Sequence, residues 1–78
     1  MNYEKEVKRI VANCLEMPVD SFDSGADMSE ISEWDSMRNV MILSQLEDYF
    51  DIVFPEDDIF DLTSVRALAE EIEKIKGL

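Results

Sequence analysis

The chain is organised around the stretch from Asp35 to Phe50, which has the pattern of one amphipathic helix preceded by its capping residue. The pair Asp35-Ser36 predicts a helix start, because Asp and Ser oxygens accept hydrogen bonds from the unpaired amides of a first helical turn. Apolar residues follow at positions 37, 40, 43, 46 and 50, which is helical spacing. We therefore expect a helix over about residues 36–50. Taken alone, the pair indicates no more than a helix cap, since such pairs open many helices.

The apolar residues of this helix cover more than one face. The positions expected to face the core are Val40, Leu43, Leu46 and Phe50. Met37, Met41 and Ser44 fall on a neighbouring strip, so the two methionines exceed what the core needs. A flexible, polarisable methionine suits a surface that accepts several partners, and the alternative is that both methionines are buried among the helices.

A second main helix is expected from Tyr3 to about Leu15. Its apolar residues recur at the spacing that stacks them on one helix face. They are Tyr3, Val7, Ile10, Val11, Cys14 and Leu15. Pro18 disfavours helical backbone at Met17, so this helix should end near Leu15 or Glu16.

The C-terminal part of the chain predicts one short helix and one longer helix. Pro55 suits the first turn of a short helix over residues 56–60. Thr63 or Ser64 then caps the last helix, and Gly77 suits its C-terminal end. The core face of the last helix consists of Val65, Leu68, Ala69, Ile72 and Ile75. Because no segment alternates as a half-buried strand does, the sequence predicts an all-α bundle of three main helices and one short helix.

A long loop over residues 17–34 is expected between the first two main helices. Such a loop is uncommon in a small domain unless it is functional or packs as a unit. The apolar residues expected to pin it across the bundle are Val19, Phe22, Met28 and Ile31. A calcium-binding register that begins at Asp20 fails, because Phe22 and Ile31 stand where an oxygen ligand and a bidentate glutamate are required. We expect no metal site.

Composition indicates a single domain over residues 1–78 and excludes several classes of function. Nineteen acidic residues against seven basic ones give a net charge of −12, which repels nucleic acid and favours basic protein partners. The lack of histidine excludes a Ser-His-Asp triad and a histidine metal site. The only cysteine, Cys14, lies on an apolar helix face and is expected to be a buried contact. No apolar run reaches membrane-spanning length, and we expect a soluble, cytoplasmic monomer that is not an enzyme.

This short, acidic, helical chain resembles the acyl carrier proteins over nearly all of its length. The matching positions are Asp35-Ser36-Met37 for the family's D-S-L motif, then Val40, Leu43, Leu46, Glu47 and Phe50, then Phe54-Pro55-Glu56 and Leu62-Thr63-Ser64-Val65. The resemblance implies that 4'-phosphopantetheine is attached to Ser36. It also implies that Asp35 helps the modifying transferase to position metal or substrate, in addition to capping the helix. Trp34 gives the W-D-S variant seen in many stand-alone carriers and in peptidyl carrier domains.

The function implied by the resemblance is to carry acyl groups as thioesters in fatty acid, polyketide or related biosynthesis. The alternatives are an aminoacyl or peptidyl carrier and, outside the family, an unmodified acidic helical adaptor. The implied partners are a phosphopantetheinyl transferase and acyl-loading ligases, synthases or acyltransferases with basic docking surfaces. Residues expected to contact partners are Met37, Met41, Ser44, Glu47 and Asp48. Met41 departs from the acidic residue that many fatty acid carriers present there, which leaves the cognate synthase or ligase open.

Overall fold

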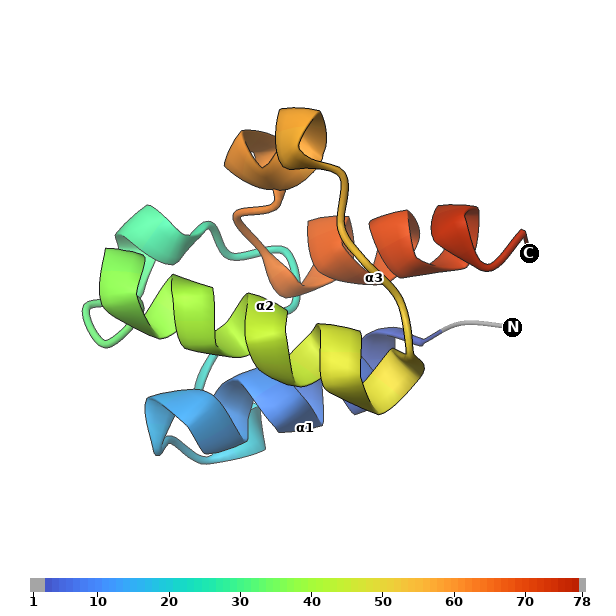
Figure 1. The fold of residues 1–78 in the computed structure, drawn as a ribbon. Helices are drawn as coiled ribbons and strands as arrows, with labels where there is room; N and C mark the ends of the chain where they lie inside the picture. Colours follow the sequence, from blue (N-terminus) through green and yellow to red (C-terminus); the bar gives the residue numbers. More distant parts are fainter. Residues whose placement is uncertain (1–2, 78) are drawn as a thin grey trace.

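Three α-helices and three short 3-10 helices surround one apolar core in the computed structural model, which describes residues 3–77 (Figure 1). The main helices are α1 (Glu4–Leu15), α2 (Ser36–Phe50) and α3 (Val65–Ile75). The 3-10 helices η1 (Val19–Ser21) and η2 (Met28–Glu30) interrupt the loop before α2, and η3 (Glu56–Asp61) precedes α3. The expected all-α bundle, with three main helices, a short helix before the last one and a long loop after the first, is confirmed.

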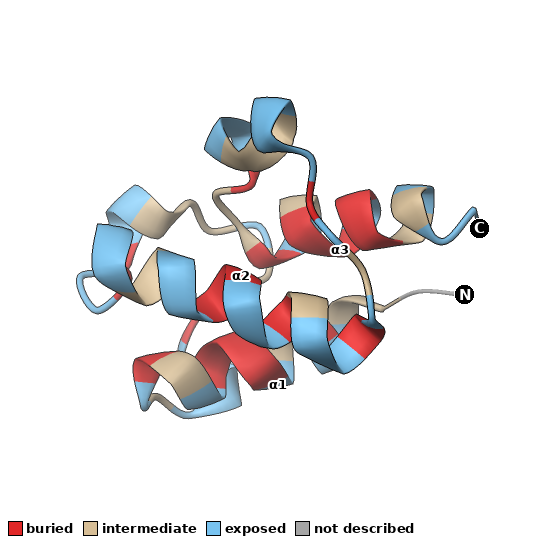
Figure 2. Ribbon diagram, viewed as in Figure 1, coloured by how far each residue is buried: buried red, intermediate tan, exposed pale blue. Residues whose placement is uncertain are grey.

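α1 packs against both α2 and α3, whereas α2 and α3 approach each other less closely. Figure 2 shows the buried residues of the three helices facing a common interior. Those with no exposed surface include Val7 and Val11 of α1, Ile42 and Leu46 of α2, and Leu68 and Ile72 of α3. Full burial of one such side chain is worth about 1.5–3 kcal/mol, so these contacts fix α2 against α1.

The buried face of α2 differs from the sequence expectation at one position. Leu43, Leu46 and Phe50 are buried as expected, but Val40 is 67% exposed, so its assignment to the core is wrong. Ile42 is fully buried instead. Successive residues turn by about 100° around an α-helix, so a helix that buries Ile42 must turn Val40 toward solvent.

The loop before α2 is tied to the start of α3. The carboxylate of Asp27 accepts hydrogen bonds from the Ser29 amide at 2.9 Å and from the Thr63 hydroxyl at 2.7 Å. The Met28 amide donates to the Thr63 carbonyl oxygen at 2.7 Å. Since Thr63 lies just before α3, these bonds hold the middle of the loop against the N-terminal end of α3.

Three of the four expected anchors of this loop reach the core. Phe22 and Ile31 are buried, and Met28 is partly buried against them. Val19 is 40% exposed, so its assignment as an anchor is wrong. It stands at the start of η1, and the chain turns inward only at Phe22, where the backbone is extended after that helix ends. Trp34, which is 3% exposed, is a further anchor that the apolar pattern did not indicate.

The last helix has the expected caps. The Ser64 hydroxyl, and not that of Thr63, accepts a hydrogen bond from the Ala67 amide at 3.1 Å. Gly77 follows the helix with a φ of 77°, a conformation that favours glycine. Ile75 is partly buried at the edge of the core. The short helix expected at residues 56–60 is the 3-10 helix η3.

The Asp27 contacts predict a specific acid sensitivity. Hydrogen bonds from Ser29 and Thr63 lower the pKa of the Asp27 carboxyl from 3.8 to about 2. Because this pKa is lower in the folded than in the unfolded chain, ionised Asp27 contributes stability above about pH 4, and that contribution is lost as the pH falls toward about 2. We predict that Asp27→Asn makes the free energy of unfolding less dependent on pH in this window, as measured by urea titrations. Asp20→Asn, at an exposed position of the same loop, is the control, and an unchanged pH dependence in Asp27→Asn would contradict the prediction.

Candidate functional site

The candidate site is the first turn of α2. Ser36 is the first residue of the helix, and it is exposed. Asp35 is the N-cap, and its Oδ1 accepts a hydrogen bond from the Arg38 amide at 2.8 Å. The amides of Ser36 and Met37 have no acceptor among residues 3–77. Two free N–H groups and the positive end of the helix dipole therefore lie beside the Ser36 hydroxyl, where an anion is favoured.

The chain has no imidazole base to activate this serine. It contains no histidine, so the hydroxyl lacks the imidazole partner that serine nucleophiles commonly use. Its exposure instead leaves it accessible to a second protein. The first turn of α2 therefore fits a serine that is modified by another enzyme.

Trp34 fixes the backbone that leads into the site. Its indole Nε1 donates a hydrogen bond to Oδ1 of Asn39 at 3.0 Å, and its amide donates to the Ile31 carbonyl at 3.0 Å. The ring itself is buried. The residues on either side of Ser36 are thereby held to each other.

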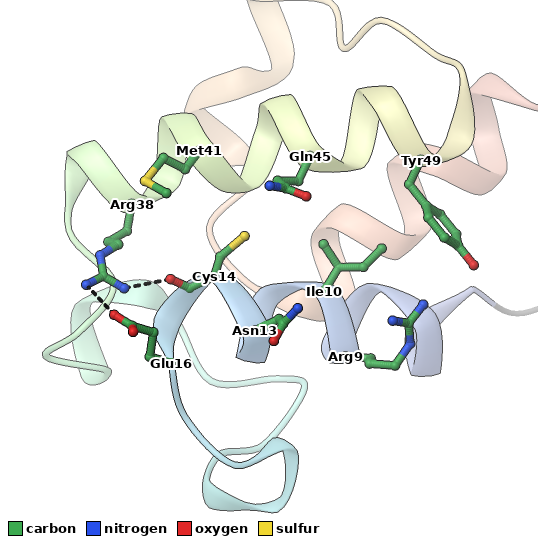
Figure 3. A pocket seen from close by; sticks show the side chains of 9 residues that line it. All are labelled: Arg9, Ile10, Asn13, Cys14, Glu16, Arg38, Met41, Gln45 and Tyr49. Carbon is green, nitrogen blue, oxygen red and sulfur yellow. Dashed lines mark hydrogen bonds and ion pairs between the residues drawn. The ribbon is translucent and has the colours of Figure 1, made fainter.

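Arg38 connects the site to α1. Its guanidinium donates a hydrogen bond through Nη1 to the carbonyl oxygen of Cys14 at 2.6 Å, and its Nη2 lies 3.4 Å from Oε2 of Glu16 (Figure 3). Cys14 belongs to the last turn of α1, where carbonyl groups lack helical partners. The first turn of α2 is therefore bonded to the last turn of α1.

The solvent-facing residues of α2 form what we call the outer strip. It consists of Met37, Val40, Met41, Ser44 and Asp48, all exposed. Met37 is 76% and Met41 47% exposed, as expected for residues that the core does not need. The apolar period assigned Val40 to the core, although a helical projection centred on Ile42 places it on the outer strip.

Glu47, expected to supply charge to a partner, differs from the outer strip. It is half-buried, and its Oε2 accepts a hydrogen bond from the Phe54 amide at 2.8 Å. One carboxylate oxygen therefore holds the segment that follows α2. Asp48 is exposed and forms no ion pair among residues 3–77.

A groove of about 550 Å³ runs between α1 and α2. Figure 3 shows Arg38 near one end, Arg9 and Tyr49 near the other, and Met41 and Cys14 between them. Cys14 is half-buried, and burial raises the pKa of its thiol against the opposing effect of Arg38. The thiol is thus protonated near neutral pH and is a packing contact, not a nucleophile.

The part of the chain that the structure describes contains neither a metal-ion cluster nor a membrane-spanning helix. Within residues 3–77, no three His, Cys, Asp or Glu side chains gather where they could hold a metal ion. None of the described helices combines the length and the apolar character needed to cross a membrane. The first turn of α2 remains the arrangement that the sequence and the geometry both single out.

Two matches with known proteins show the family to which this chain is similar. Residues 5–72 match the family model described as a phosphopantetheine attachment site. The chain is also 30% identical over 74 residues to an acyl carrier protein of Akkermansia muciniphila, an alignment that covers 95% of this chain and 92% of that protein. Both matches span the first turn of α2.

Variants of Asp35 should separate the effect of its capping hydrogen bond on stability from the effect of its charge. Asp35→Ala removes the acceptor of the Arg38 amide and should lower the free energy of unfolding by about 0.5–2 kcal/mol. Asp35→Asn keeps an oxygen acceptor at the cap and should lose much less stability. Urea unfolding of both variants checks this, and equal losses would show that the charge of Asp35, and not its hydrogen bond, stabilises the helix.

Proposed function

We propose that this chain, which belongs to the acyl carrier protein family, carries acyl groups as thioesters on an arm attached to Ser36. The cofactor of the family is 4'-phosphopantetheine, and its members are carriers and not catalysts. The observation that supports Ser36 is its exposure as the first residue of α2, directly after the capping aspartate. Asp-Ser pairs also occur at residues 20–21 and 23–24, but only Asp35-Ser36 stands at the start of one of the three main helices.

The first turn of α2 fits the phosphodiester that joins such an arm to a serine. The free amides of Ser36 and Met37 can donate to an anion, and the helix dipole favours negative charge at this end. The carboxylate of Asp35 is directed to the Arg38 amide, which stabilises the turn. When bound, the arm supplies the thiol that forms the thioester. The protein supplies the attachment point of the arm and its orientation.

We further propose that the outer strip of α2 is the surface on which partner enzymes dock. Burying one exposed methionine would contribute about 1.5–3 kcal/mol, whereas an exposed charge pair made by Asp48 would contribute about 0.2–1 kcal/mol. The net charge of −12 steers the carrier toward basic surfaces. Charge should therefore set the association rate, and apolar contact should set the lifetime of the complex.

The proposed partners are a phosphopantetheinyl transferase and the ligases, synthases or acyltransferases of fatty acid, polyketide or related biosynthesis. The single cysteine, which has no disulfide partner, is compatible with a reducing cytoplasm, where we propose that the carrier works. Aminoacyl loading is the alternative. Offering the modified chain to fatty-acyl and amino-acid ligases in parallel distinguishes the two kinds of cargo.

The attachment site is tested by intact mass after incubation with a broad-specificity phosphopantetheinyl transferase and coenzyme A. The native chain should gain one phosphopantetheine, and Ser36→Ala should gain none. Ser36→Ala should stay folded, because losing one hydroxyl at a helix start costs at most about 0.5–2 kcal/mol and Asp35 still caps the helix. Ser32→Ala, an exposed serine of the preceding loop, is the matched control and should be modified normally. A modified Ser36→Ala protein would sink the assignment, and an unmodified native chain would favour the adaptor.

Docking is tested by placing a charge on the outer strip. Met37→Glu and Met41→Glu should leave the melting temperature nearly unchanged, because both side chains are exposed, but should slow acyl loading by a cognate ligase or synthase. Val53→Glu adds the same charge at an exposed apolar residue outside α2 and is the control. If Met41→Glu instead lowers the melting temperature strongly, Met41 contributes to the packing of the groove and not to docking.

A further inference from the structure

The Arg38 side chain caps the C-terminal end of α1, although Arg38 lies 24 residues after Cys14 in the chain. The C-cap residue after α1, Glu16, has the left-handed conformation, and the amides of Glu16 and Met17 donate to the carbonyls of Asn13 and Ala12. The Cys14 carbonyl receives its hydrogen bond from the Arg38 guanidinium. A cation at this end of a helix also interacts favourably with the helix dipole.

The backbone of the same residue is held as well. The Arg38 amide donates to the Asp35 carboxylate, so the residues on both sides of Ser36 and Met37 are joined by one hydrogen bond. The side chain then bonds this short segment to α1. Ser36 therefore lies in a turn that is closed by Asp35 and anchored by Arg38.

This anchor is separate from the apolar core. The Arg38 side chain is one-third exposed, and the core of α2 is formed by other residues, led by Ile42 and Leu46. Loss of the Arg38 side chain should therefore loosen the first turn of α2 without unfolding the bundle.

We propose that Arg38 is a positioning residue for the modification of Ser36. The inference rests on the proposed function. The guanidinium bonded to the Cys14 carbonyl fixes where the first turn of α2 lies relative to α1, and so where the transferase finds the Ser36 hydroxyl. A misplacement of about 1 Å at a reacting group can cost on the order of a hundredfold in rate. Arg38 itself does not touch the reacting atoms.

The test compares Arg38→Met, which keeps an apolar stem, with Arg38→Lys, which keeps a cationic donor for the Cys14 carbonyl. Arg66→Met is the matched control, because Arg66 forms the other ion pair of the described residues, with Glu4 at 3.1 Å, and lies on α3. It makes the same change of side chain and of net charge away from Ser36. Each variant is modified by a broad-specificity phosphopantetheinyl transferase with coenzyme A, and kcat and KM for the carrier are measured separately.

We expect Arg38→Met to lower kcat by about tenfold to a hundredfold with little change in KM, because docking is kept while the hydroxyl is misplaced. Arg38→Lys should recover part of the loss, and Arg66→Met should match the native chain. Trp34, the single tryptophan, gives a second readout that needs no enzyme. Its fluorescence should be more accessible to acrylamide quenching in Arg38→Met than in Arg66→Met, because Trp34 is bonded to Asn39 of the same turn.

Three results would overturn the proposal. A raised KM with an unchanged kcat would mean that Arg38 contacts the transferase directly. Native kinetics together with native Trp34 quenching would mean that Arg38 anchors nothing. Loss of the helical circular dichroism signal in Arg38→Met would mean that Arg38 holds the whole fold and not one turn. If the native chain itself is not modified, the proposed function fails, and the Trp34 measurement still decides whether Arg38 holds the turn.

Discussion

The packing of α1 against both α2 and α3 is the interaction on which the rest of this structure depends. α2 and α3 make fewer close approaches to each other, so the relation between them is set through α1. The fully buried valines of α1, Val7 and Val11, belong to this shared interface. Two polar connections add to it, one between Arg38 and the end of α1 and one between Asp27 and the start of α3. Together they fix the N-terminus of α2 in a bundle that has a small core.

The side chains around the candidate site have distinct structural tasks. Trp34 is buried and bonded to Asn39, Asp35 caps the helix, and Arg38 reaches α1. Ser36 lies exposed in their midst. This arrangement suits a carrier, because the protein has to present a fixed attachment point and does no chemistry of its own. A helix N-terminus meets this requirement with its own amides and dipole.

The surface combines a large charge with exposed apolar residues. Only two ion pairs join side chains among residues 3–77, so most of the 19 acidic residues are free to act on the surroundings. The long-range attraction between these negative charges and a basic partner raises association rates but adds little to the lifetime of a complex. The outer strip of α2 can lengthen the lifetime of a complex, because Met37, Val40 and Met41 can bury apolar surface against a partner. Both features are consistent with the proposed transient contact with basic enzymes.

Local sequence determined the helices and their caps, because these depend on residues close together in the chain. The apolar period predicted α1, α2 and α3 to within a few residues, and Asp35, Ser64 and Gly77 stand at the expected ends. The D-S-L-like motif pointed to Ser36 in the same way. Contacts between distant segments were decided only by the tertiary structure. The orientation of α2 follows from where α1 and α3 lie, which is why Val40 is exposed and Ile42 buried. Arg38 meets a carbonyl 24 residues away, and Glu47 reaches the Phe54 amide. No local pattern encodes such pairings, because they form only when packing of the apolar faces brings the segments together.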